Sequence, residues 1–297
     1  MKKSLIITIF IIIAICSKAQ EGYNDYIEAA KKGNPEAQHK LGMCLALGIG
    51  VERNYSESLA WYRKSAEQGY APAINSIGYC YKNGLGVTKD YTQAAQWFRK
   101  AAEKGYADGQ KNLGYCYYYG YGTTEDKKEA VKWWTKAAEQ NEAEAQNELA
   151  FCYKDGIGVE KNPQKAFDLW VKSANQGDAD AQNSLGHCYS NAFGVQEDPV
   201  KAFEWWKKAA ENGNINGIVS VAYCHAKGYG VEQNMATAAL WWFNAAEKGH
   251  APSQYYLGVC YKEGIGFKKD SNLAKEWIQK SADQGFPDAI RELENLK

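Results

Sequence analysis

The sequence predicts an all-α fold: a right-handed α/α solenoid of seven 36-residue helix-turn-helix repeats, with a capping half-repeat at each end. Two observations predict it. Six Gly-x-Gly turns recur at equivalent positions of the repeats, and an Asp or Asn recurs at a second equivalent position in all seven repeats. Seven cysteines are also spaced 36 residues apart without interruption: Cys44, Cys80, Cys116, Cys152, Cys188, Cys224 and Cys260. A fixed period of about 20–50 residues is typical of proteins whose repeats bury their apolar faces against one another.

The first 19 residues have the pattern of a signal peptide. Lysines at the start precede an apolar run over 5–15, which is short for a membrane span, and the small residues Ser17 and Ala19 fit cleavage before Gln20. We therefore expect residues 1–19 to be removed and the protein to be exported, to the periplasm or the cell exterior.

Two alternatives to cleavage remain open. Cys16 could carry a lipoprotein anchor, although the bulky Ile15 stands before it, where small residues are normal. The leader could also stay attached as a membrane anchor. In the mature chain we expect no membrane span.

Charge does not point to a particular partner. The chain has 35 basic and 35 acidic residues, so removal of three leader lysines leaves 32 against 35. This balance gives no electrostatic reason to expect nucleic-acid binding. We expect a monomer whose partner is a protein or peptide.

The repeats follow one another without a linker. Residues 20–34 form half a unit and predict an N-terminal capping helix, and residues 287–297 restart the pattern and predict a C-terminal capping helix. Between them lie repeats 1 to 7: 35–70, 71–106, 107–142, 143–178, 179–214, 215–250 and 251–286.

Each repeat is expected to contain two helices. In repeat 2, Ala73, Ile77 and Cys80 lie on one face of a helix that ends at the glycine turn beginning at Gly84. Asp90 then caps the second helix, because its side chain can accept a hydrogen bond from an unpaired backbone N–H. The equivalent caps are Asn54, Asp126, Asn162, Asp198, Asn234 and Asp270.

Small residues and aromatic pairs indicate how the helices pack. A glycine such as Gly78 in mid-helix costs about 1 kcal/mol against alanine, so its recurrence predicts close contact between helices. Pairs such as Trp97-Phe98 and Trp205-Trp206 on the second helices are expected to wedge between layers. Each second helix should end at a glycine, except where Asn141 takes the left-handed conformation instead.

The pattern that these residues form closely resembles the Sel1-like repeat, a relative of the tetratricopeptide repeat. Repeat 4 carries it clearly, with Ala145-Gln146, Leu149, Tyr153, Gly156-Ile157-Gly158 and Lys165-Ala166. The resemblance extends over all seven repeats and both half-repeats. It implies a scaffold or adaptor that binds other proteins, and for secreted bacterial members it implies roles in envelope assembly, signalling or host contact.

The seven regular cysteines are expected to be buried free thiols. Equivalent positions on stacked helices are separated by about 8–10 Å, whereas a disulfide needs Cα atoms within about 7 Å. A cysteine-rich branch of the resembled family links cysteines eight residues apart, but here those positions hold Ala102 and Gln110. A metal ladder or a redox site is the alternative interpretation.

No catalytic motif is recognisable in the chain. The sequence contains no G-x-S-x-G, S-x-x-K or H-E-x-x-H, so we expect no enzyme activity, no cofactor and no metal. The alternative function comes from the resemblance, since cysteine-rich family members have been linked to penicillin binding. It is a β-lactam- or peptidoglycan-interacting protein with weak β-lactamase-like activity.

The outward face of the first helices is the candidate binding site. Stacked repeats bring amide and amine groups into one row and aromatic rings into the next, and this combination suits an extended peptide. The alternative is that about half of these rings lean into the neighbouring repeat. The predicted groove residues are Asn75, Tyr79, Lys82, Lys111, Tyr115, Asn147, Phe151, Asn183 and His187, and Tyr223 continues the aromatic row.

Overall fold

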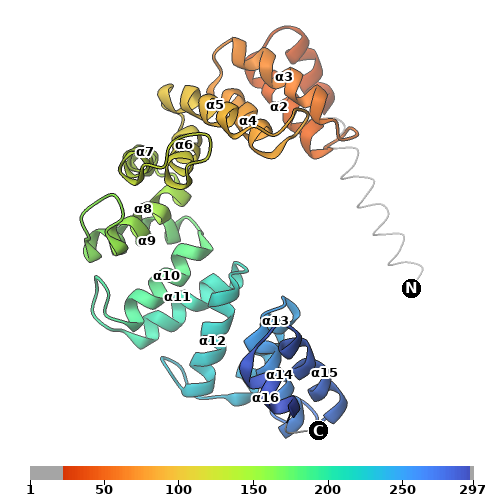
Figure 1. Ribbon diagram of the computed structural model, residues 1–297, viewed down its shortest axis with the longest axis vertical. Coiled ribbons are helices and arrows are strands. Elements are labelled where there is room, and N and C mark those ends of the chain that lie inside the picture. The colour runs from red at the N-terminus through yellow and green to blue at the C-terminus, as the bar shows by residue number, and fades with distance from the viewer. Residues whose placement is uncertain (1–22, 295–297) are drawn as a thin grey trace. The chain divides into compact units, whose positions relative to one another are not determined.

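The computed structural model describes residues 23–294, which form helices joined by turns, with no strand in this range (Figure 1). The predicted all-α solenoid of helix-turn-helix repeats is confirmed. The expected signal peptide, residues 1–19, lies outside the described residues. So do the ends of the two predicted capping helices, at residues 20–22 and 295–297. The described chain divides into two compact units, which separate after residue 145, except that residues 157–159 belong to the first.

Unit 1 consists of paired helices that follow one another along the chain. Residues 23–31 are helical and precede the first full pair. Within each pair the two helices pack together, and the second helices of repeats 1 and 2 also pack against the first helix of the next repeat (Figure 1). The pairs are α2 (Pro35–Leu47) with α3 (Tyr55–Glu67), α4 (Ala71–Asn83) with α5 (Tyr91–Glu103), and α6 (Ala107–Tyr119) with α7 (Lys127–Glu139).

Unit 2 continues the same arrangement. The helix α8 (Ala143–Asp155) starts in unit 1 and enters unit 2 at residue 146. The short α16 (Pro287–Glu294) packs on α15 and covers the end of the last repeat. The helices between them are α9 (Pro163–Asn175), α10 (Ala179–Ser190), α11 (Pro199–Glu211), α12 (Ile215–Lys227), α13 (Met235–Glu247), α14 (Ala251–Glu263) and α15 (Ser271–Asp283).

The predicted helix ends are confirmed. Asp90 Oδ1 accepts a hydrogen bond from the Gln93 backbone N–H at 3.0 Å, and the six equivalent Asp and Asn residues cap their own second helices in the same way. Asn141 adopts a left-handed φ of 63° where the other repeats have glycine. The caps fix where each second helix begins, so all of them start in the same register.

The mid-helix glycines permit close contact between the two helices of a repeat. A Cβ atom built on Gly114 would lie 2.4 Å from the Trp134 ring, and one built on Gly186 would lie 2.3 Å from Trp206. Both indoles are buried, so no room exists for a side chain opposite them. The recurring glycine is therefore explained by the ring that lies over it.

The aromatic pairs divide their roles more sharply than the sequence predicted. In repeat 2 only Phe98 is buried, whereas Trp97 is half-buried and the Lys100 ammonium lies 4.2 Å from its ring centroid. The second member wedges between helices, and the first is shielded by a lysine three residues later. Repeat 6 differs, because Asn244 replaces that lysine and Trp242 is only half-buried.

Buried glutamines connect consecutive repeats. In repeat 5, Gln182 donates to the Ala174 carbonyl of the preceding repeat at 3.1 Å and accepts from Asn212 at 2.9 Å. The residue types at these two positions, one on each helix of a repeat, vary together along the chain. Where the first helix has isoleucine instead of glutamine, the second helix has lysine. The pairs are Gln38 with Gln68, Ile74 with Lys104, Gln110 with Gln140, Gln146 with Gln176, Gln182 with Asn212, Ile218 with Lys248, and Gln254 with Gln284.

The seven regular cysteines are buried and free, as predicted. Burial raises the pKa of Cys80 to about 11 and that of Cys188 to about 12. Thiols in such surroundings are poor nucleophiles, because only the thiolate reacts. They serve as small apolar side chains in the core.

Candidate functional site on the first helices

The nine predicted groove residues are divided between the two units. Unit 1 holds Asn75, Tyr79 and Lys82 on α4, with Lys111 and Tyr115 on α6. Unit 2 holds Asn147 and Phe151 on α8, with Asn183 and His187 on α10. We therefore describe two separate surfaces, one in each unit.

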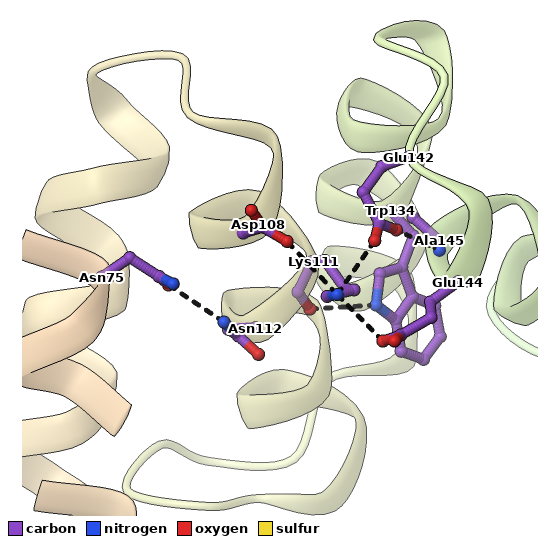
Figure 2. Close-up of polar contacts among 8 residues, drawn as sticks. All are labelled: Asn75, Asp108, Lys111, Asn112, Trp134, Glu142, Glu144 and Ala145. Carbon is purple, nitrogen blue, oxygen red and sulfur yellow. Dashed lines mark hydrogen bonds and ion pairs between the residues drawn. The ribbon is translucent and has the colours of Figure 1, made fainter. Parts of the chain in front are cut away.

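Of the five predicted residues in unit 1, only Tyr79 is exposed. Tyr79 is 52% exposed, whereas Lys82 and Tyr115 are half-buried. Tyr115 packs edge-on against Trp134 with ring centroids 5.4 Å apart, so it leans into the repeat as well as lining the surface. Asn75 is also engaged, because its Oδ1 accepts a hydrogen bond from Asn112 at 2.9 Å (Figure 2).

Lys111 lies at the centre of an ion-pair cluster in unit 1. Its ammonium is 2.9 Å from Glu142 and from Glu144, and 3.4 Å from Asp108 (Figure 2). The side chain is only 11% exposed. Burial disfavours its charged form, but the hydrogen bonds to Glu142 and Glu144 outweigh this effect and hold the pKa of Lys111 above its ordinary value.

The cluster fastens the junction between repeats 3 and 4. The Lys111 backbone carbonyl accepts a hydrogen bond from Trp134 Nε1 at 3.1 Å, and Glu142 also accepts from the Ala145 backbone N–H (Figure 2). Lys111 was predicted as a donor for a bound peptide. Its ammonium instead holds three carboxylates of the chain itself, so it is no open donor.

On the unit 2 side, Asn147 is buried, contrary to its predicted place on an open face. It is 6% exposed, and its Oδ1 accepts a hydrogen bond from Trp170 Nε1 at 3.0 Å. Trp170 is large and fully buried, so the bond satisfies an indole donor that water cannot reach. Asn147 is therefore not available to a bound peptide.

The other three unit 2 residues line a hollow between α8 and α10. Phe151, Asn183 and His187 border this space, which has a volume of about 340 Å³. Phe151 packs edge-on against Trp170 at 5.2 Å, and the exposed His187 places its ring edge-on to Trp206 at 5.3 Å.

Desolvation and the Lys154 ammonium both act on the titratable groups of the hollow. The His187 side chain is exposed on one side, but the protein around its ring desolvates it and lowers its pKa, and the nearby Lys154 lowers that pKa further. Burial raises the pKa of Cys188, and Lys154 opposes that rise. The positive charge of Lys154 therefore affects the two titratable side chains that α10 contributes to the hollow.

Sequence reasoning missed several residues of this hollow. Its remaining lining comes from Lys154, Trp170, Ser184, Cys188, Asn191 and Phe193. The available signal was the turn of repeat 5, where Asn191-Ala192-Phe193-Gly194 replaces the Gly-x-Gly turn of the other repeats. Ala192 has a left-handed φ of 53°, and α10 ends one residue earlier than its equivalents.

Within the described residues, no group of three or more His, Cys, Asp or Glu side chains is placed to hold a metal ion. In the same part of the chain, no helix has both the length and the apolar character needed to cross a membrane.

Comparison with protein families matches seven copies of the model described as the Sel1 repeat, at residues 35–70, 71–106, 107–142, 143–178, 179–214, 217–250 and 251–286. The chain belongs to the Sel1 repeat family. The resemblance inferred from repeat 4 is thereby confirmed. No curated protein matches the chain significantly.

Two solved Sel1 repeat structures are similar over most of the chain. The c5321 protective antigen of uropathogenic Escherichia coli is 35% identical with a TM-score of 0.80, and the match covers 90% of this chain and 57% of the antigen. A Sel1 repeat protein from Oxalobacter formigenes is 30% identical with a TM-score of 0.75, covering 95% of this chain and 82% of that protein. This chain therefore spans little more than half the length of the antigen.

Proposed function

We propose that this Sel1 repeat protein is an exported, non-catalytic scaffold that binds a polypeptide partner along the outward positions of its first helices. The observation that carries the proposal is the contrast between two sets of positions. The core positions repeat with little change, whereas the outward positions differ and leave aromatic rings open, with Tyr79 and Tyr223 each 52% exposed.

Exposed aromatic rings beside polar groups favour a polypeptide ligand. Tyrosine supplies a large contact area at a low cost in side-chain entropy, and for this reason it is enriched where proteins meet. The fold class supports the same function, because Sel1 repeats are typical of protein–protein interaction scaffolds.

Photo-crosslinking in the native cell tests the proposal. A photoreactive amino acid placed at Tyr79 or at Tyr223 should crosslink to a partner that mass spectrometry identifies. The matched control places it at Leu240, which is 57% exposed but lies on the second helix α13. Equal crosslinking of the same polypeptide from all three positions would contradict a role for the first helices.

Export and the absence of catalysis have their own tests. Mass spectrometry of the mature protein should find Gln20 at the N-terminus, whereas a lipid on Cys16 or an intact Met1 would contradict cleavage after Ala19. The purified protein should not hydrolyse nitrocefin above the blank rate. Turnover would favour the β-lactam-interacting alternative.

A further inference from the structure

The hollow between α8 and α10 is lined largely by apolar side chains. Aromatic rings from three elements border it: Phe151 on α8, Trp170 on α9 and Phe193 in the turn after α10. Its volume of about 340 Å³ is at the lower end of the range of ligand sites, about 300–1,000 Å³. The space is large enough for one bulky side chain and the backbone next to it.

One polar atom at this hollow has no partner. Asn183 Oδ1 is shielded from solvent and accepts no hydrogen bond. Its equivalent one repeat earlier, Asn147, accepts from Trp170 Nε1 at 3.0 Å. The corresponding bond in repeat 5 is not formed, because Trp206 Nε1 is likewise buried without a partner.

Buried acceptors are rarely left unpaired in folded proteins, so Asn183 Oδ1 calls for a donor from elsewhere. Asn183 lines the hollow, so rotation of its amide group would present Oδ1 to a donor that enters this space. A backbone N–H of an extended peptide is such a donor.

Charge adds a third constraint. Lys154 is the only cation among the residues that line the hollow, and no carboxylate is among them. Its ammonium is 3.6 Å from Asp155, and both side chains are more than 40% exposed, so this pairing is weak. An acidic group on the ligand would be complementary to the Lys154 side of the hollow.

We propose that the hollow is an anchor site for an extended peptide in which a large apolar residue stands next to an acidic one. The apolar side chain packs among Phe151, Trp170 and Phe193, its backbone N–H donates to Asn183 Oδ1, and the acidic neighbour pairs with Lys154. This inference rests on the proposed function and specifies the peptide chemistry that unit 2 selects.

Calorimetry with a synthetic peptide tests the anchor. The probe is an acetylated and amidated pentapeptide of sequence Ser-Asp-Phe-Asp-Ser, titrated into the full-length protein. Matched peptides replace the central phenylalanine by alanine, replace both aspartates by lysine, or methylate the backbone nitrogen of the phenylalanine. We expect each change to weaken binding at least tenfold, and failure of the parent peptide to bind at millimolar concentration would overturn the proposal.

Variants of the protein assign each contact. Asn183→Val should weaken binding of the parent peptide at least fivefold. It should also remove the effect of N-methylation, because valine has no acceptor for the backbone N–H. Valine is suitable here, since Val219 occupies the equivalent position of repeat 6. If N-methylation weakens binding equally in both proteins, Asn183 does not accept the bond and the proposal is wrong.

Lys154→Glu should reverse the preference between the acidic and the lysine peptide. Its matched control is Lys82→Glu, because Lys82 is the equivalent residue two repeats earlier and does not line the hollow. Equal effects of the two variants would overturn the assigned role of Lys154. Far-UV circular dichroism checks that each variant is folded.

The two proposals can fail separately. A partner crosslinked from Tyr79 or Tyr223, together with no binding of the peptide, would retain the scaffold function and overturn the anchor. Binding that follows the predicted pattern supports the anchor.

Discussion

Asn147 and Trp170 form a buried hydrogen bond of 3.0 Å that joins the first and second helices of repeat 4. In repeat 5 the same two positions hold Asn183 and Trp206, and neither group has a partner. The same residue types in the same register therefore form a stabilising hydrogen bond in one repeat and stay unpaired in the next.

The first prediction compares alanine at these two asparagines. Asn147→Ala should lower the free energy of unfolding by about 1–3 kcal/mol, because it leaves Trp170 Nε1 buried without a partner. Asn183→Ala removes no hydrogen bond and should change stability by less than about 0.5 kcal/mol. Urea unfolding measures both, and an equal loss in the two variants would contradict the difference between the repeats.

The second prediction concerns Lys111. Lys111→Met should destabilise the protein by about 2 kcal/mol, because Glu142 and its neighbours then lack their cation. Glu144→Gln in the same chain should restore part of this loss. Lys132→Met is the control, since Lys132 makes an exposed pair with Glu129 and should cost less than about 0.5 kcal/mol.

The contribution of the Lys111 cluster has a defined pH range. The pKa of Lys111 is raised above the ordinary 10.5, so its contribution is complete below pH 10.5 and is lost as the pH rises above that value. The difference in unfolding free energy between the wild type and Lys111→Met should therefore stay constant from pH 7 to 9. A decline within this range would contradict the raised pKa.

The third prediction is an acid sensitivity caused by His39. Burial lowers its pKa to about 4, while the ring lies 3.0 Å from the Ser76 hydroxyl. The unfolded chain takes up a proton near pH 6.5 but the folded protein does not. The contribution of His39 to stability is therefore present above pH 6.5 and is lost as the pH falls from 6.5 to 4.

His39→Asn tests this acid sensitivity, because asparagine occupies the same position in repeats 2, 4 and 5. Between pH 7 and 4 the variant should lose about 1–3 kcal/mol less stability than the wild type, with the lower end favoured by the partial exposure of the ring. Parallel losses in urea unfolding at the two pH values would show that His39 is not responsible.

The fourth prediction concerns the thiols. At pH 8 none of the seven regular cysteines should react with an aromatic disulfide reagent in the folded protein, because all seven are buried and burial blocks access. Burial also raises the pKa of thiols such as Cys188, which keeps them protonated. All seven should react after unfolding in guanidinium. An eighth reactive thiol after unfolding would mean that Cys16 is retained, and rapid reaction of the folded protein would contradict burial.

The fifth prediction concerns the turn of repeat 5. Ala192→Gly should raise stability by about 0.5–1 kcal/mol, since the left-handed conformation of alanine is relieved while the unfolded chain gains some entropy. The control is Ala226→Gly in the helix α12, where glycine should lower stability by about 1 kcal/mol. Destabilisation by both substitutions would mean that Ala192 is not strained.

Sequence alone determined the architecture, because the signals that specify it are local. Asp90 caps α5 by accepting a hydrogen bond from the backbone N–H three residues later. Asn141 adopts the left-handed conformation that ends its helix, and this conformation depends on the residue type at that position. The same signals recur in every repeat, and the regular spacing of the cysteines shows which positions of the repeats are equivalent. Burial of the thiols followed from the same helical spacing.

Tertiary structure alone decided which outward residues are open. Asn147, Asn183 and Lys111 occupy one register of the first helix, yet one is buried, one faces a hollow and one holds three carboxylates. Apart from Asp108, which is three residues from Lys111, their partners lie 23 to 33 residues away or come from a turn with its own geometry. Helical periodicity carries no information about such contacts. Which side chains are open on the surface therefore depends on contacts between helices. These contacts differ from repeat to repeat, and the repeat pattern does not record the differences.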